Sequence, residues 1–82
     1  MYEIIFSDKA KKQLEKLDRK IQARIIKVLE RIRMRPEAYV TKLVGDAGYK
    51  FRVGDYRVIC DIRDRQLILL VVTIGHRRDV YD

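Results

Sequence analysis

Three cations near the middle of the chain, Lys50, Arg52 and Arg57, have the types and spacing of a phosphate-binding site. They lie in two alternating runs that flank Gly54-Asp55, and glycine supplies the positive φ that a two-residue hairpin turn requires. Such a turn places Arg52 opposite Arg57, with Lys50 beside them on the same face of the hairpin. Arginine offers a planar fork of donors and lysine a mobile point charge, so this face is expected to bind phosphate.

This arrangement of charge opposes folding. Like charges directly opposite across a strand pair destabilise it by about a few tenths of a kcal/mol, so a sequence selected only for stability would avoid them. The intervening residues Tyr49, Phe51 and Val53 are predicted to point the other way, into the core. A local conflict of this kind favours a functional role. The alternative is that the three side chains extend into solvent and have no role.

The C-terminal segment adds further chemistry at the edge of this face. It carries the imidazole of His76, the guanidinium of Arg77 and the phenol of Tyr81. A second turn at Asp64-Arg65, with an unbroken ladder after it, predicts that Ile59, Leu70, Val72, Ile74 and His76 share the face of the cations. Taken alone, His76 is more often a surface or structural histidine than a catalyst, and Tyr81 alone could be a terminal anchor.

Periodicity before Pro36 predicts a short strand and two helices. Tyr2–Phe6 alternates as a strand, and Ser7 or Asp8 is suited to cap a helix that contains Ala10–Leu17. Asp18 is suited to cap a second helix with Ile21, Ile25, Val28, Leu29 and Ile32 on its inner face, and Pro36 ends it.

After Pro36 the pattern changes to that of strands. A short strand at Thr41–Leu43 is followed by Tyr49–Val53, Tyr56–Ile62 and Leu67–Ile74. The order of elements predicts a two-layer α+β fold, with an N-terminal strand and an αα-hairpin packed on an antiparallel sheet of four to five strands. The length is that of one domain, residues 1–82.

The formal net charge of +7 is concentrated in the helical part, where residues 1–36 hold eleven Lys or Arg against five acids. Such a surface attracts polyanions such as nucleic acid, and the alternative is a merely solvated face. The predicted outer faces of the helices carry Lys9, Lys12, Lys16, Lys20, Arg24 and Lys27, which are the candidate RNA-binding residues.

The remaining composition argues against several classes of protein. Cys60 is the only cysteine, lies on the core side of its strand and is interpreted as a small buried hydrophobe. No Cys/His cluster has metal-ligand spacing, no apolar run approaches the length of a membrane helix, and the N-terminus lacks the pattern of a signal peptide. We therefore expect a cytoplasmic protein with no metal, cofactor or membrane partner.

The segments Tyr49–Ile59 and Ile74–Tyr81 resemble the RelE branch of the RelE/ParE toxin superfamily, and Arg33-Met34-Arg35-Pro36 also fits. The resemblance implies the RelE-like fold and a toxin that cuts mRNA in the ribosomal A site without a metal. It also implies a RelB-like antitoxin as partner. ParE-like members share the fold, lack the catalytic set and act on DNA gyrase.

By position, the resemblance implies that Lys50 is the catalytic lysine, Arg52 a second basic position and Arg57 the residue that holds the scissile phosphate. It implies that Arg77 follows the last strand and that Tyr81 stacks on a base or orders the site. The sequence departs from the RelE pattern in two ways. Arg52 stands where lysine is frequent in the family, and the terminal segment is shorter. We expect Lys50 to be the base, since a guanidinium stays protonated. Either His76 or Arg77 is then the acid.

Two other functions are compatible with parts of this pattern. A ParE-like or catalytically silent relative would use the same basic face only to bind a partner. A nonspecific RNA-binding domain is less consistent with the sequence, because Tyr49, Phe51 and Tyr56 are predicted to point into the core and leave no stacking platform.

Overall fold

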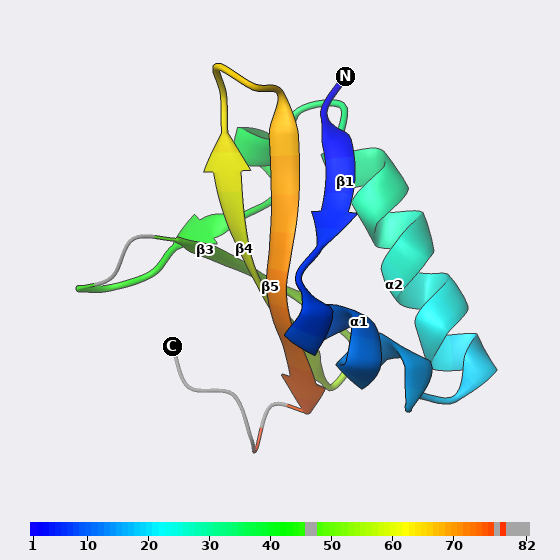
Figure 1. Cartoon of the computed structure of the whole chain (residues 1–82). Helices are drawn as coiled ribbons and strands as arrows, with labels where there is room; N and C mark the ends of the chain where they lie inside the picture. The colour runs from blue at the N-terminus through cyan, green and yellow to red at the C-terminus, as the bar shows by residue number, and fades with distance from the viewer. Residues whose placement is uncertain (46–47, 77, 79–82) are drawn as a thin grey trace.

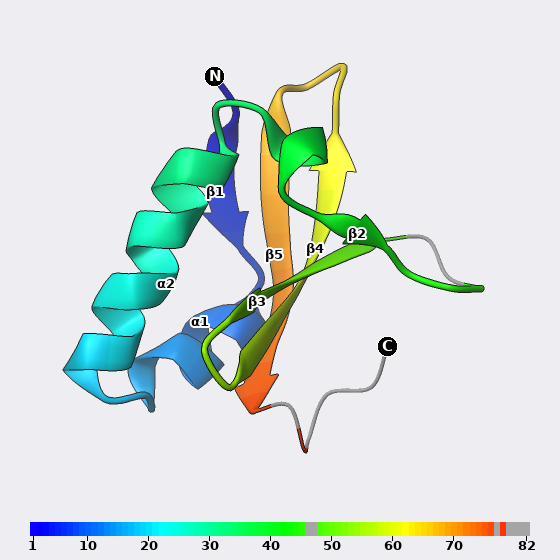
Figure 2. The ribbon, with the colours of Figure 1, turned by 180° about the vertical axis from the view of Figure 1, so that it is seen from behind.

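The computed structural model describes residues 1–45, 48–76 and 78. Five strands form one sheet in the order β1-β5-β4-β3-β2, and both helices lie on one side of it (Figures 1 and 2). The predicted α+β class is confirmed. The elements are β1 (Glu3–Phe6), α1 (Asp8–Glu15), α2 (Arg19–Ile32), the 3-10 turn η1 (Pro36–Ala38), β2 (Thr41–Lys42), β3 (Tyr49–Val53), β4 (Tyr56–Arg63) and β5 (Ile68–His76).

The sheet is mixed, whereas the alternation of the later strands predicted an antiparallel one. β1 pairs with β5 in parallel, from Glu3 opposite Ile68 to Phe6 opposite Val71, while the other pairs are antiparallel. A parallel pair needs a long connection, and the helices and strands between β1 and β5 supply it. The N-terminal strand therefore forms one edge of the sheet beside the central strand β5.

The core lies between the helices and the facing side of the sheet. α1 contributes Ala10. Of the predicted inner stripe of α2, Ile25, Leu29 and Ile32 are buried, and the other two residues are partly buried against the core. On the sheet, alternate residues of β3 and β4 face this core, which includes Cys60. The buried hydrophobic core consists of Ala10, Ile25, Leu29, Ile32, Phe51, Val53, Val58, Cys60, Leu69, Val71 and Ile74.

The two helix starts differ in how they are held. Ser7 caps α1, since its hydroxyl accepts a hydrogen bond from the amide of Ala10 at 3.0 Å. Asp18 occupies the cap position of α2, but the predicted side-chain cap is absent. Gln22 fixes the turn between the helices by donating to the carbonyls of Leu14 and Leu17, at 2.9 and 2.8 Å.

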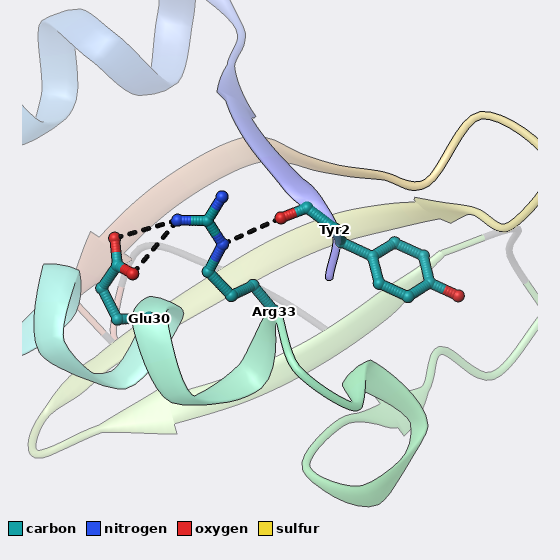
Figure 3. Close-up of polar contacts among 3 residues, drawn as sticks. All are labelled: Tyr2, Glu30 and Arg33. Carbon is teal, nitrogen blue, oxygen red and sulfur yellow. Dashed lines mark hydrogen bonds and ion pairs between the residues drawn. The ribbon is translucent and has the colours of Figure 1, made fainter.

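Arg33 joins the end of α2 to the start of the sheet, as Figure 3 shows. Its Nε donates to the carbonyl of Tyr2 at 2.9 Å, and its Nη1 lies 3.1 Å from the carboxylate of Glu30. The amide of Tyr2 in turn donates to the carbonyl of Arg33 at 2.9 Å. These contacts align the first strand with the second helix.

The turn between β4 and β5 is longer than predicted. It spans residues 64–67, and Leu67 adopts a φ of 54° there instead of beginning the strand. The Tyr2 hydroxyl donates to Asp64 at 2.6 Å, and this hydrogen bond raises the pKa of Tyr2 to about 12. The start of β1 is thus tied to this turn.

A β-bulge in β5 decides where its C-terminal half points. Ile59 pairs with Thr73 and Cys60 with Val71, so Val72 is the extra residue. β1 ends opposite Val71, and α1 continues the contacts along this edge. The Ser7 hydroxyl donates to the carbonyl of Val72 at 2.8 Å, and the side-chain oxygen of Gln13 accepts from the amide of Ile74 at 2.7 Å.

We expect Gln13→Ala to lower the free energy of unfolding by about 1–2 kcal/mol, because the amide of Ile74 loses its acceptor at the bulge. Gln13→Glu retains an acceptor oxygen and is expected to stay close to the wild type. Denaturant unfolding measures the change. Gln66→Ala, in the exposed β4–β5 turn, is the control; equal losses for Gln13→Ala and Gln66→Ala would contradict a role for Gln13 at the bulge.

No helix in the part of the chain that the structure describes is long and apolar enough to cross a membrane.

Candidate functional site

The β3–β4 hairpin has the register that the Gly54-Asp55 turn predicted. Gly54 adopts a φ of 60°, Arg52 lies opposite Arg57, and Lys50 lies opposite Ile59. Val53 and Phe51 face the helices and are buried, so the three cations project from the opposite side of the sheet. The predicted like-charge pair is confirmed, and the sheet face away from the helices carries it.

The three cations line one hollow of about 310 Å³ on this face. This volume is at the lower end of the range of about 300–1,000 Å³ that is typical of small-molecule sites. Arg52 is exposed and Lys50 is half-buried, while the Nε atom of Arg57 is buried. The complete lining is Tyr39, Thr41, Lys50, Phe51, Arg52 and Arg57.

Besides Phe51, which was predicted to lie in the core, two lining residues were not predicted as site residues, Tyr39 and Thr41. Thr41 reaches the hollow because β2 pairs with β3 and places it opposite Lys50. Tyr39 precedes it by two positions, directly after η1, and its side chain is exposed. The sequence signal for both was weak, since the connection carries no motif. Only the pairing of β2 with β3 brings them to the cations.

The structure corrects the predicted position of His76. Because of the bulge at Val72, His76 pairs with Tyr56, which belongs to the helix side of the hairpin. The His76 and Tyr56 rings make an edge-to-face contact with centroids 5.6 Å apart. Ile74 likewise lies in the core, whereas an unbroken ladder predicted it on the basic face. Gly75, which has no side chain, lies opposite Arg57 instead.

The structure does not test two of the predicted site residues, because Arg77 and Tyr81 lie outside the described residues. It does place the six candidate RNA-binding cations. Lys9, Lys12 and Lys16 are exposed at α1, and Lys20, Arg24 and Lys27 are exposed on α2.

Arg24 differs from the other helical cations, because its guanidinium covers the hairpin turn. A Cβ atom built on Gly54 would lie 3.4 Å from the Nη1 atom of Arg24. This close approach connects the outer surface of α2 with the turn between Arg52 and Arg57. Arg24 therefore has a packing role in addition to its charge.

Cys60 is fully buried in the core, as its strand position predicted. Burial, with a smaller contribution from the neighbouring Asp61, raises the pKa of its thiol to about 12. The thiol is therefore protonated at neutral pH and is poorly suited to act as a nucleophile.

Comparison with known proteins identifies the family. A model of the ParE toxin of the parDE type II toxin–antitoxin system matches residues 4–81. The chain belongs to the RelE/ParE toxin superfamily. It is thus the toxin of a type II toxin–antitoxin pair. This toxin is 34% identical over 86 residues to an Escherichia coli protein described as RelE-like toxin, in a match that covers 99% of this chain and 90% of the relative.

Solved RelE structures share the fold of this RelE/ParE toxin. The toxin in the intact E. coli RelBE toxin–antitoxin complex superposes with a TM-score of 0.82 and 26% identity, over 93% of this chain and 96% of that one. A chain of the RelBE2 complex from Mycobacterium tuberculosis gives a TM-score of 0.85 at 23% identity, over 95% and 93% of the two chains. The RelE-like fold is therefore confirmed.

Proposed function

We propose that this toxin is a ribosome-dependent, metal-independent endoribonuclease that cuts mRNA in the A site and stops translation. The observation that carries the proposal is the convergence of Lys50, Arg52 and Arg57 on one hollow. Two guanidinium groups on directly paired residues can hold the non-bridging oxygens of a single phosphodiester. The resemblance of the hairpin to RelE toxins and the RelE-like relative support the same reaction.

The reaction begins at the 2′-hydroxyl group of the nucleotide before the scissile bond. Lys50, as the general base, removes its proton, and the 2′-oxygen attacks the phosphorus while the bond to the 5′-oxygen breaks. Arg52 and Arg57 stabilise the phosphorane, which carries more negative charge than the diester. The leaving 5′-oxygen takes up a proton, so the products end in a 2′,3′-cyclic phosphate and a 5′-hydroxyl.

The proton donor is assigned to Arg77 in this proposal, since His76 faces the helix side of the sheet. A guanidinium is a weak general acid. Its contribution would therefore combine partial proton donation with charge stabilisation of the leaving oxygen.

We expect His76→Ala to keep the single-turnover cleavage rate within about tenfold of the wild type, whereas loss of a general acid costs about 100-fold or more. The physical reason is its contact with Tyr56 on the face opposite the cations. Rapid-quench kinetics on programmed ribosomes measures the rate, and His76→Gln is a more conservative companion. A loss above 100-fold in both variants would restore His76 as the acid.

The test of the proposed function uses ribosomes programmed with a defined mRNA. Addition of the toxin is expected to produce a new 3′ end within the A-site codon, which primer extension maps to the nucleotide. Arg57→Ala should greatly reduce the product at a fixed early time. Arg65→Ala removes an arginine in the exposed β4–β5 turn and should keep it. The decisive condition is wild-type toxin at amounts equal to the ribosomes, in magnesium buffer without EDTA. If no mRNA is cut under this condition, the proposed nuclease activity is rejected.

The exposed helical cations are proposed to hold ribosomal RNA through phosphate contacts, which weaken steeply with salt. Reversing Lys12, Lys16 and Lys27 to glutamate should weaken ribosome binding and flatten its salt dependence while the fold stays intact. Arg24 is left unchanged because it packs over Gly54. Co-sedimentation at about 50 and 200 mM salt measures both effects; unchanged binding at low salt would contradict the role of these cations.

The proposed partner that neutralises the toxin is a RelB-like antitoxin. Solved relatives are RelBE toxin–antitoxin complexes from E. coli and M. tuberculosis and a RelE–RelB complex from Pyrococcus horikoshii. A small acidic reading frame next to the gene is the expected source. Co-expression should yield a stable complex and suppress mRNA cleavage, and a complex without suppression would contradict neutralisation.

The second candidate function is that of a ParE-like toxin without nuclease activity, because the matching family model is that of the ParE toxin. In that case the basic face binds a protein partner. Inhibition of DNA gyrase supercoiling by the purified toxin, together with intact mRNA on programmed ribosomes, would favour this alternative. Cleaved mRNA with unaffected gyrase would reject it.

A further inference from the structure

An exposed aromatic ring borders the cationic hollow, at a position to which no role has been assigned. Tyr39 is 49% exposed, whereas Phe51, the other aromatic residue of the lining, is 6% exposed. Among the described residues, no hydrogen bond to the Tyr39 hydroxyl is found. About half of the Tyr39 side chain is therefore open to solvent at the wall of the hollow, where a ligand can contact the ring.

The backbone holds Tyr39 in a defined place. Pro36 is fully buried and begins η1, and the amide of Tyr39 closes this turn by donating to the carbonyl of Pro36 at 3.1 Å. Val40 then packs against the core, and Thr41 pairs with Lys50. The backbone of Tyr39 is therefore held between a buried proline and a sheet pairing, and its side chain lines the hollow that carries the cations.

We infer that Tyr39 is a stacking platform for a nucleobase of the bound RNA, and that the hollow holds one nucleotide. The phosphate lies on Lys50, Arg52 and Arg57, and the adjoining base lies on the Tyr39 ring. This inference rests on the proposed function and deepens it, because it assigns base recognition to the connection before β2. Tyr39 would thus provide the basic face with an aromatic platform that the sequence did not predict.

The chemistry of the hollow favours a nucleotide over an acidic peptide. A carboxylate of a peptide would interact only with the cations. A nucleotide would in addition stack its base on the flat ring beside them. Stacking on an aromatic side chain is tolerant of base identity and contributes an effect of about 5- to 150-fold in affinity per base. The hollow of about 310 Å³ lies near the lower end of the range for small-ligand sites, a size that suits one nucleotide.

The test measures the binding of two short RNAs by fluorescence anisotropy at low salt. One probe is an uncleavable 2′-O-methyl hexanucleotide, and the other is the same backbone with abasic nucleotides, which keeps the charge and removes the bases. Tyr39→Ala should weaken binding of the first probe at least about fivefold and leave binding of the second unchanged. Tyr39→Phe should stay within about twofold for both, since the ring is retained.

The matched control is Met34→Ala, which removes an exposed apolar side chain just beyond the end of α2 and outside the hollow. It should bind both probes as the wild type does. Equal binding of the base-bearing probe by wild type and Tyr39→Ala would overturn the inference. An equal loss for the abasic probe would also overturn it, because the ring would then act through the cations. Absence of saturable RNA binding by the wild type would do the same.

Failure of this inference and failure of the nuclease are distinguishable. If Tyr39 is required for base-dependent binding but programmed ribosomes leave mRNA intact, the nuclease is rejected and the stacking role stands. If mRNA is cut and Tyr39→Ala binds both probes normally, only the stacking role is lost.

Discussion

Replacing Arg57 with alanine is expected to lower the single-turnover rate of mRNA cleavage about 100- to 1,000-fold, the usual loss when one preorganised donor to a developing oxyanion is removed. Arg57 lines the hollow from β4, its Nε atom is buried, and it pairs directly with Arg52. Burial of the Nε atom restricts the guanidinium before substrate arrives, so little reorganisation is expected during phosphorane formation.

The controls for Arg57 separate charge from geometry. Arg57→Lys keeps the charge but loses the planar fork, so it should recover only part of the rate. Arg65→Ala removes an exposed arginine outside the hollow and should be indistinguishable from the wild type. Thermal melts of each variant identify any loss of folding. A folded Arg57→Ala variant that cuts mRNA within about threefold of the wild-type rate would contradict the assignment.

Lys50→Ala is expected to reduce cleavage about 100- to 10,000-fold, the range for loss of a general base. Lys50 is half-buried on β3, opposite Thr41 on one side and Ile59 on the other. The informative companion is Lys50→Arg, which keeps a positive charge at the same register position but stays protonated and so cannot accept a proton as a base. If Lys50 is the base, both variants lose the rate.

The two Lys50 variants separate general-base catalysis from charge stabilisation. Near-normal cleavage by Lys50→Arg would show that Lys50 contributes charge only, and the base would have to be sought elsewhere. Full activity of both Lys50→Ala and Arg57→Ala would reject the site itself.

Local chemistry in the sequence was sufficient to predict the hairpin. The pair Gly54-Asp55 has the composition of a two-residue turn, and such a turn fixes the register of every residue on both strands. Alternation then separated Phe51 from Lys50 and Arg52, because neighbouring side chains in a strand point to opposite faces. The α2 stripe of Ile25, Leu29 and Ile32 was predicted for the equivalent reason at helical spacing.

Long-range pairing decided the features that the sequence did not show. The parallel pairing of β1 depends on which edge of β5 is available after the sheet forms, and no local pattern encodes it. The bulge at Val72 lies just beyond the end of β1. There the side chains of Ser7 and Gln13, and no longer a paired strand, hydrogen-bond to the edge of β5. Because side chains alternate, this single extra residue moved Ile74 and His76 to the other face.

The basic face therefore has two origins. Its three cations and their mutual positions were determined by the sequence alone, since a tight turn and strand alternation act over a few residues. The residues around the cations were determined by the tertiary structure. Pairing of β2 with β3 places Tyr39 and Thr41 beside the cations, and the bulge in β5 places His76 on the opposite face. Contacts between residues distant in sequence depend on the packing of the whole sheet.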